Sequence, residues 1–510
     1  MSAAVMVETQ ESESVFKPAL LLMSGRTLAF AATFFIPVVL ARIFDPAEFG
    51  TYKQLFLVHS TIYCIAQLGM ASSLYYFLPR APHEAGRYAA NSMCFLGMAG
   101  LAALGLIVMA TPKLAQWMSN SALTAYLPWI GLYLFLIMLS TTLEIVLISR
   151  SRYLWASASY AISDLARAAA FILPVLVFRQ LSWLLWGAIA VAFVRVIVTL
   201  SYFRREFGST FTPDRVLLKS QLVYALPFAA AVLVETLQAS FPQYAVSYLF
   251  DPATFAIFAV GCLQIPLVDF AASPTSDVMM VKMQERLAEG RTLAVLTIWH
   301  DTTWKLALLF FPLFAFCMVA AREIIVFLFT AKYAASAPIF MTWSTVILFT
   351  TFQVDGVMRV FAQTWFLLAL NVMRLAIIVG LIKWSLSQFH LVGPVLVIAL
   401  ATLVFKAAAL ARMKTLLQIS AARLLPWRSL AALLCTVAGA AAAAFAVKSQ
   451  IHVSAVLLLL AMGTTFMFTY AALVWQFDLL LGDEKLALTG WVRKAALTIA
   501  RTFGFRKGIA

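Results

Sequence analysis

The sequence predicts an all-α polytopic membrane protein with about 14 transmembrane helices, arranged as two pseudo-symmetric six-helix lobes plus two C-terminal helices. Three observations predict this class. The 510 residues are 63% hydrophobic and 12% charged, whereas soluble domains are about half apolar and a quarter charged. The apolar residues form runs of roughly 20, the length that crosses a bilayer. A nine-residue phrase also occurs twice, which indicates a duplicated unit.

Fourteen apolar runs are long enough to be spans. They fall at residues 19–42, 52–78, 89–111, 122–148, 158–178, 183–203, 217–249, 253–276, 293–319, 336–361, 364–386, 391–411, 428–447 and 453–477. With the N-terminus placed inside, most of the 37 lysines and arginines fall in cytoplasmic segments, as the positive-inside rule requires. The alternation predicts an even number of spans with both termini cytoplasmic.

The repeated phrase sets the boundaries of the lobes. Residues 44–52 (Phe-Asp-Pro-Ala-Glu-Phe-Gly-Thr-Tyr) return, 206 residues later, as residues 250–258 (Phe-Asp-Pro-Ala-Thr-Phe-Ala-Ile-Phe). Six spans separate the copies, so the lobes should be related by a pseudo-twofold axis along the membrane normal. The predicted organisation is a cytoplasmic segment 1–18, a first lobe 19–206, a second lobe 207–412, two added spans in 413–480 and a basic cytoplasmic tail 481–510.

Each copy of the phrase predicts the start of a helix. An aspartate followed by proline supplies an N-cap acceptor and a residue suited to the first helical position. Asp45 and Pro46 fill these positions before span 2, and Asp251 and Pro252 fill them before span 8. Capping explains these residue types, so we assign them a structural role.

Ionisable residues inside spans are the candidates for function, because they are costly in lipid and face partners or water. Three acid–base pairs lie one helical turn apart and can neutralise themselves: Asp164 with Arg167, Asp301 with Lys305, and Asp355 with Arg359. Four bases have no such neighbour on their own helix: Arg26, Arg195, Arg374 and Lys406.

Arg26, Arg195 and Arg374 are hypothesised to attract an anionic diphosphate, which a guanidinium binds through two parallel hydrogen bonds. Asn371, one turn before Arg374, and Gln238 in span 7 are added as polar substrate contacts. The alternative is that the arginines pair across helices with Glu144, Glu235 or Asp269. Both interpretations fit the sequence.

Span 7 combines an acid with two helix-weakening prolines. Glu235 lies near its centre, between Pro227 and Pro242, each of which removes a backbone hydrogen bond. Glu235 and Asp269 are therefore candidates for ion coupling to H⁺ or Na⁺. A salt bridge from Glu235 to one of the arginines is the competing interpretation.

Two segments carry a family resemblance. Residues 26–52, which end in the first copy of the phrase, and residues 327–337 (Phe-Leu-Phe-Thr-Ala-Lys-Tyr-Ala-Ala-Ser-Ala) resemble the Wzx-like polysaccharide flippases of the MOP (multidrug/oligosaccharidyl-lipid/polysaccharide) exporter superfamily. The family often has glycine where Thr330 stands. The resemblance covers roughly residues 18–412. It implies flipping of a lipid-diphosphate-linked oligosaccharide by alternating access between two lobes, with the first helix lining the cavity.

The resemblance also implies location and partners. We expect a multi-pass protein of the bacterial inner (plasma) membrane that serves surface polysaccharide export, of O-antigen or exopolysaccharide. The expected substrate is an oligosaccharide on an undecaprenyl diphosphate-type lipid, with membrane lipids, a polysaccharide polymerase and glycosyltransferases as further partners. A peptidoglycan lipid-precursor flippase and a MATE-type drug/cation antiporter are the alternative transporters.

Other classes are less well supported. A polyprenyl-linked membrane glycosyltransferase generally needs a sizeable outer loop, whereas the longest predicted loops here are cytoplasmic. The sequence contains no G-x-x-x-x-G-K-[ST] phosphate loop. The five cysteines lie in apolar runs without metal-ligand spacing. The net charge of +15 follows the predicted topology, so we expect no enzyme activity, metal, cofactor or nucleic-acid partner.

Overall fold

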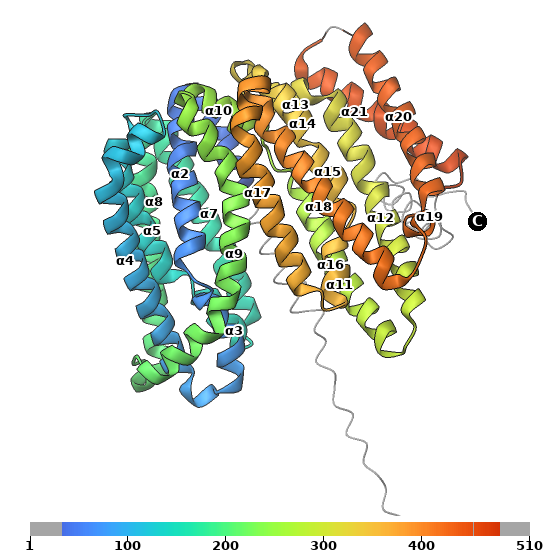
Figure 1. Cartoon of the computed structure of the whole chain (residues 1–510). Helices are drawn as coiled ribbons and strands as arrows, with labels where there is room; N and C mark the ends of the chain where they lie inside the picture. Colours follow the sequence, from blue (N-terminus) through green and yellow to red (C-terminus); the bar gives the residue numbers. More distant parts are fainter. Residues whose placement is uncertain (1–32, 452, 480–510) are drawn as a thin grey trace, which may run out of the picture. The chain divides into compact units, whose positions relative to one another are not determined.

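The computed structural model describes residues 33–451 and 453–479, and every regular element in these ranges is a helix (Figure 1). The described chain forms two compact units. Unit 1 contains the described residues up to Leu267 together with Ile325–Trp343 and Gln363–Ala408. Unit 2 contains Val268–Ile324, Ser344–Ala362 and the described residues from Ala409 onward. The predicted lobe boundary between residues 206 and 207 stays a prediction.

Unit 1 holds most of the long helices. Its elements are a helix at Thr33–Ile43, α2 (Pro46–Ala66), α3 (Met70–Arg80), α4 (Ala85–Trp117), α5 (Leu123–Ser140), α6 (Leu143–Ser149), α7 (Tyr153–Phe178), α8 (Leu181–Phe207), α9 (Arg215–Leu249), α10 (Pro252–Gly261), α14 (Ala337–Trp343) and α17 (Thr364–Phe389).

Unit 2 holds α11 (Pro266–Ala288) apart from its first two residues, α12 (Thr292–Val319), α15 (Thr345–Thr350), α16 (Val354–Val360), α19 (Ala421–Leu424), α20 (Trp427–Gln450) and α21 (Ala455–Gln476). Two helices, α13 (Ala321–Phe329) and α18 (Gly393–Leu417), contribute residues to both units.

The helices are long and apolar enough for a multi-pass membrane protein. Eleven of those described qualify as spans, or twelve when the bent pair α10–α11 is counted as one. One of the eleven is the 54-residue run Thr364–Leu417, which at 1.5 Å per residue greatly exceeds a bilayer of about 30 Å. It therefore supplies two spans, α17 and α18. With Thr33–Ile43 as the described part of the first span, the predicted 14 spans fit the structure.

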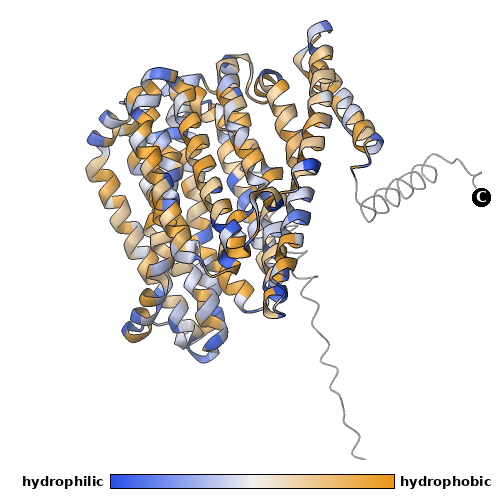
Figure 2. Cartoon of the chain, turned by 45° about the vertical axis from the view of Figure 1, so that its right-hand side comes forward, coloured by the Kyte–Doolittle hydropathy of each residue, from blue (hydrophilic) through white to orange (hydrophobic). Residues whose placement is uncertain are grey.

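Apolar side chains cover the surface of these helices. In Figure 2 hydrophobic residues occupy the middle stretches of the helices, and hydrophilic residues gather at helix ends and loops. Large apolar side chains remain exposed, including Met109, Trp365 and Phe468. This is the pattern expected where the surrounding solvent is lipid.

Several spans are broken within the apolar run. The α2–α3 span is interrupted at residues 67–69, where Leu68 and Gly69 both have positive φ. The α5–α6 span breaks at Thr141 and Thr142, and α10 meets α11 at 48°. In contrast, α9 continues through Pro227 and Pro242. Hydropathy alone did not indicate these breaks, because each predicted apolar run continues across its break.

The two copies of the repeated phrase, which we call the repeat corners (residues 44–52 and 250–258), begin α2 and α10. Asp45 accepts a hydrogen bond from the Glu48 amide at 2.8 Å, and Asp251 accepts from the Ala253 and Thr254 amides. Both aspartates thus act as N-caps, with proline at the start of each helix.

The repeat corners pack against each other, because α2 and α10 run side by side. At Gly50 an added Cβ would lie 1.8 Å from the Pro252 carbonyl oxygen. The second family-like segment also reaches this region: Tyr333 makes an edge-to-face contact with Phe49, and Arg42 donates hydrogen bonds to the Leu328 and Phe327 carbonyls. The segments that carry the resemblance are therefore neighbours in unit 1.

Candidate functional site

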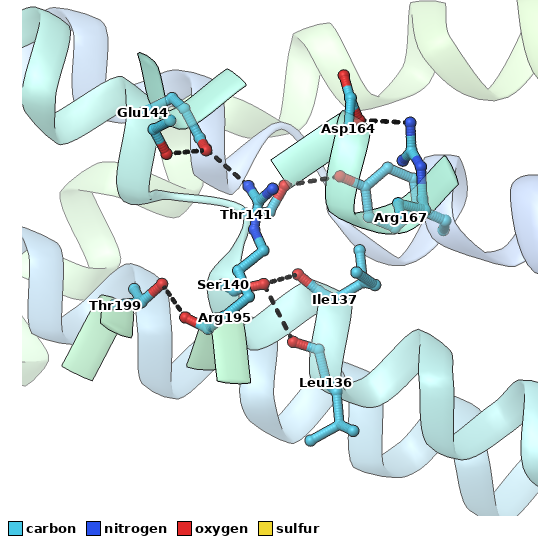
Figure 3. Close-up of polar contacts among 11 residues, drawn as sticks. Leu136, Ile137, Ser140, Thr141, Glu144, Asp164, Arg167, Arg195 and Thr199 are labelled. Carbon is cyan, nitrogen blue, oxygen red and sulfur yellow. Dashed lines mark hydrogen bonds and ion pairs between the residues drawn. The ribbon is translucent and has the colours of Figure 1, made fainter. Parts of the chain in front are cut away.

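Two ion pairs within the described spans of unit 1 lie near each other and form one network. Its members come from α2, α5, α6, α7 and α8, all of which belong to unit 1. Figure 3 shows two arginines, each directed at a carboxylate, beside the break between α5 and α6. The network therefore contains two positive and two negative side chains.

The first ion pair joins Arg195 of α8 to Glu144 of α6. Their side chains meet at 2.7 Å, and that of Glu144 is only 3% exposed. The second carboxylate oxygen accepts a hydrogen bond from Ser159 at 2.8 Å. Because a buried carboxylate requires both a counter-charge and hydrogen bonds, the structure places Arg195 in the cross-helix pairing that was the alternative to substrate binding.

The break at Thr141 and Thr142 positions this pair. The two threonines interrupt the apolar run, so that Glu144 lies in the first turn of a new helix, α6. Thr141 also shares a hydrogen bond with the Tyr63 hydroxyl at 2.6 Å, which joins α2 to the same point. The sequence contained a signal for this break in the Thr-Thr pair preceding an intramembrane acid.

The second ion pair lies on α7. Arg167 and Asp164 are 2.5 Å apart, and their side chains keep 34% and 23% exposure. Arg167 also donates to the Thr33 hydroxyl at 3.0 Å. Arg167 lies in the middle of α7, where an exposed charge is stable only against partners or water. The partner here is Asp164, so the two charges neutralise each other within the span.

Aromatic side chains border the network on the α2 side. His59 stacks on Tyr63 with ring centroids 5.9 Å apart, and it lies 5.1 Å from Tyr133 of α5. Phe56, one turn earlier on α2, packs against Phe171 of α7. These rings fix the face that α2 presents to α5 and α7. Tyr63 and Tyr133 are not among the residues predicted from the sequence.

A second polar cluster joins two of the predicted substrate residues. The buried Gln238 of α9 donates to the main-chain oxygen of Asn371 at 2.7 Å and lies 3.4 Å from its side-chain oxygen. Both helices belong to unit 1. Arg374 follows one turn after Asn371 on α17 and is half-buried.

The remaining predicted site residues lie elsewhere. Glu235 is exposed on α9, and Asp269 is exposed in the first turn of α11, in unit 2. Lys406 is half-buried on α18. Arg26 and the tail 481–510 lie outside the described residues.

Sequence reasoning missed a line of polar contacts between α2 and α9. The fully buried Gln54 donates to the Ser247 hydroxyl at 2.8 Å, and its side-chain oxygen accepts from Asn120 at 2.6 Å. Two turns further along α2, Thr61 donates to Ser240 at 3.0 Å. The sequence contained a signal for these contacts. Gln54 and Thr61 in one apolar run, and Ser240 and Ser247 in another, are each spaced seven residues apart.

Unit 2 contains a cavity of about 880 Å³ between α11, α12 and the start of α20. Its lining is mostly apolar, with Lys282, His300, Lys305, Asp301 and Asp478 as the ionisable groups. Lys305 is paired with Asp301 at 2.7 Å. The mixed charges give no preference for an anion. Among the described residues, no three His, Cys, Asp or Glu side chains are grouped to hold a metal ion.

Comparison with known proteins gives one family and one fold. The model of a family described as polysaccharide biosynthesis protein matches residues 39–338. A search of curated proteins finds no match. Among solved structures, the lipid II flippase MurJ in an inward closed conformation superposes with a TM-score of 0.71 at 11% identity, covering 91% of this chain and 98% of that one.

Two further structures share this architecture. A MOP superfamily transporter from Pyrococcus furiosus has a TM-score of 0.52 at 15% identity, and an outward-facing multidrug resistance MATE transporter has 0.54 at 13%. Each covers 79% of this chain and 95% of the other. At these identities the likeness concerns the fold alone.

Proposed function

Because the chain belongs to the polysaccharide biosynthesis protein family, we propose that it flips a lipid-diphosphate-linked oligosaccharide across the bacterial inner membrane for export of a surface polysaccharide such as O-antigen or exopolysaccharide. One observation carries the substrate proposal: guanidinium groups lie within spans, one of them partly exposed in the middle of α7. A diphosphate linker is the part of such a substrate that guanidinium recognises.

The family match and the shared fold confirm the predicted resemblance to the MOP superfamily. The long apolar helices show a multi-pass membrane protein, and the family match and the shared fold support a transporter rather than an enzyme. The glycan and the lipid carrier are part of the proposal.

The proposed substrate contacts remain those predicted. Arg26, Arg195 and Arg374 attract the diphosphate, while Gln238 and Asn371 supply amide groups. The hydrogen bond between Gln238 and Asn371 supports the last two, because it places both amides at one point between α9 and α17. The Glu144 pairing weighs against direct contact by Arg195, since a substrate would have to displace a buried carboxylate.

Glu235 and Asp269 remain the proposed sites of coupling to H⁺ or Na⁺. Both side chains are exposed within their units, which leaves them open to an ion. A transport rate that does not respond to either ion gradient would remove this role. A polymerase and glycosyltransferases are the proposed partners in polysaccharide assembly.

A peptidoglycan lipid-precursor flippase is the second candidate. The lipid II flippase structure covers 91% of this chain, whereas the multidrug transporter covers 79%. The difference is about the size of the region 413–480 that carries α20 and α21. This favours a lipid flippase over a drug antiporter and leaves the choice of glycan to experiment.

The test is translocation by the purified full-length protein in liposomes. We expect it to move an undecaprenyl-diphosphate-linked oligosaccharide to the opposite leaflet, where an added glycosidase cleaves the sugar. Protein-free liposomes are the control for spontaneous flipping. Movement of lipid II but not of the oligosaccharide lipid would select the second candidate, and movement of neither with drug efflux intact would refute both.

A further inference from the structure

The two ion pairs of the first lobe differ in how firmly their arginines are held. Glu144 is 3% exposed and binds both Arg195 and Ser159. Removing Arg195 from this site would leave a buried carboxylate without its counter-charge, which is strongly unfavourable. Arg195 thus has a structural role, because its guanidinium is already paired with Glu144.

Arg167 is in a different position. Its side chain keeps 34% exposure, and its partner Asp164 keeps 23%, although both lie within the span α7. Because Asp164 is less buried than Glu144, separating this pair desolvates a smaller share of the carboxylate than separating Arg195 from Glu144 would. An anion at Arg167 can therefore replace Asp164 more easily than one at Arg195 can replace Glu144.

Arg167 also contacts the first described helix. One of its terminal nitrogens donates to the Thr33 hydroxyl at 3.0 Å and binds Asp164 at 2.5 Å. A diphosphate that takes two parallel hydrogen bonds from a guanidinium would compete with both contacts. Binding an anion at Arg167 would consequently also weaken the hydrogen bond to Thr33.

The internal repeat provides a second line of argument. The sequence Asp164-Leu-Ala-Arg167 on α7 has a counterpart 207 residues later in Asn371-Val-Met-Arg374 on α17, one residue more than the offset of the repeat corners. The α7 and α17 helices each contain 26 residues. Arg167 is therefore the first-lobe equivalent of Arg374, a residue already proposed to contact the diphosphate.

From these observations we infer that Arg167 is the first-lobe contact for the substrate diphosphate, and that Asp164 is its displaceable counter-ion. The inference rests on the proposed function and deepens it, because it moves the first-lobe anion contact from Arg195 to Arg167. Asp164 occupies the anion position when the substrate is absent and repels the phosphate when it is present.

The test measures binding of farnesyl diphosphate to the full chain in lipid nanodiscs, with farnesol as the ligand lacking the diphosphate. Arg167→Gln is expected to weaken farnesyl diphosphate binding by at least about 10-fold, the loss of hydrogen bonds to a charged group. Asp164→Asn is expected to tighten it about 3- to 5-fold, because the competing charge is removed. Neither variant should change farnesol binding.

Asp301→Asn is the matched control. Asp301 and Lys305 form an ion pair of similar length, 2.7 Å, on α12 in unit 2. Its neutralisation should leave farnesyl diphosphate binding unchanged. The direction of the change in Asp164→Asn distinguishes a displaceable counter-ion from a structural ion pair. A displaceable counter-ion predicts tighter farnesyl diphosphate binding when the acid is neutralised, whereas a purely structural Asp164–Arg167 pair predicts weaker binding.

Three results would overturn the inference. Weaker binding by Asp164→Asn would make the pair structural. Wild-type affinity in a folded Arg167→Gln, with affinity lost in Arg195→Gln, would return the contact to Arg195. Equal binding of farnesyl diphosphate and farnesol by the wild-type chain would instead refute the diphosphate substrate of the proposed function, and the inference with it.

Discussion

The close contact between the repeat corners can be tested by adding one methyl group, the alanine Cβ, at Gly50. In Gly50→Ala the added Cβ would meet the Pro252 carbonyl oxygen at 1.8 Å and the carbonyl carbon at 2.5 Å. Both are backbone atoms, so no side-chain rotation relieves the clash. Ordinary contact begins near 3.4 Å, and α2 and α10 must therefore separate by about 1.6 Å at this point.

The expected cost follows from two opposing terms. Overpacking a tight interior costs about 1–3 kcal/mol. Replacing glycine by alanine inside a helix recovers about 0.5–1 kcal/mol. With the middle of each range, the net destabilisation of the packed corners is about 1.25 kcal/mol, which shifts the equilibrium between packed and separated corners roughly 8-fold.

Gly105→Ala is the matched control, since Gly105 lies inside α4 and an added Cβ there has no atom within 4 Å. Two assays report the effect: the thermal unfolding midpoint, and maleimide labelling of Cys262 in a variant lacking the other four cysteines. Cys262 is half-buried at the end of α10. We expect Gly50→Ala to unfold earlier and label faster, and Gly105→Ala to do neither. Indistinguishable behaviour of the two variants would refute the reasoning.

Three further predictions concern named contacts. In thermal unfolding, Glu144→Gln and Arg195→Gln should each destabilise the fold by about 3 kcal/mol. The double variant should lose less than the sum of the two, because each single variant leaves one charge without its partner. Additive losses would mean that the two residues are not coupled. Lys448→Met should lower stability by about 1–2 kcal/mol, because Lys448 binds Glu323 and the Val319 carbonyl at 2.9 Å each, whereas the exposed Lys383→Met should be neutral. Asp251→Ala should cost about 1 kcal/mol through loss of the N-cap. The Thr254 hydroxyl holds the pKa of Asp251 below its usual value, so the capping carboxylate stabilises the fold above about pH 4 and less as the pH falls through the lowered pKa. Wild type should therefore lose stability relative to Asp251→Asn on acidification; a pH-independent difference would contradict this.

Local features were predictable from the sequence, because they depend on residues within one turn. The N-caps at Asp45 and Asp251 follow from the Asp-Pro order alone. The ion pairs Asp164–Arg167 and Asp301–Lys305 follow from helical spacing. The apolar runs similarly identify the spans, since a bilayer sets their length.

Contacts between helices were not predictable in the same way. Arg195 had three acids available as partners. Choosing Glu144 requires the rotation of α8 relative to α6, which the chain between residues 144 and 195 does not specify. The break at Thr141 and Thr142 changes that rotation once more. Gln54 was overlooked because its partners Asn120 and Ser247 lie on different segments and none of them is charged.

The helix α2 connects the repeat corners to the charged network. It carries Gly50 at the corner and Tyr63, whose hydroxyl meets Thr141 beside Glu144. Thirteen residues of continuous helix separate them, about 20 Å. Three residues after Tyr63 the helix ends at Ala66, just before the break that contains Leu68 and Gly69. A rigid displacement of α2 at its corner would therefore also displace Tyr63 from Thr141. The continuous helix α2 thus joins the repeat corner to the charged network.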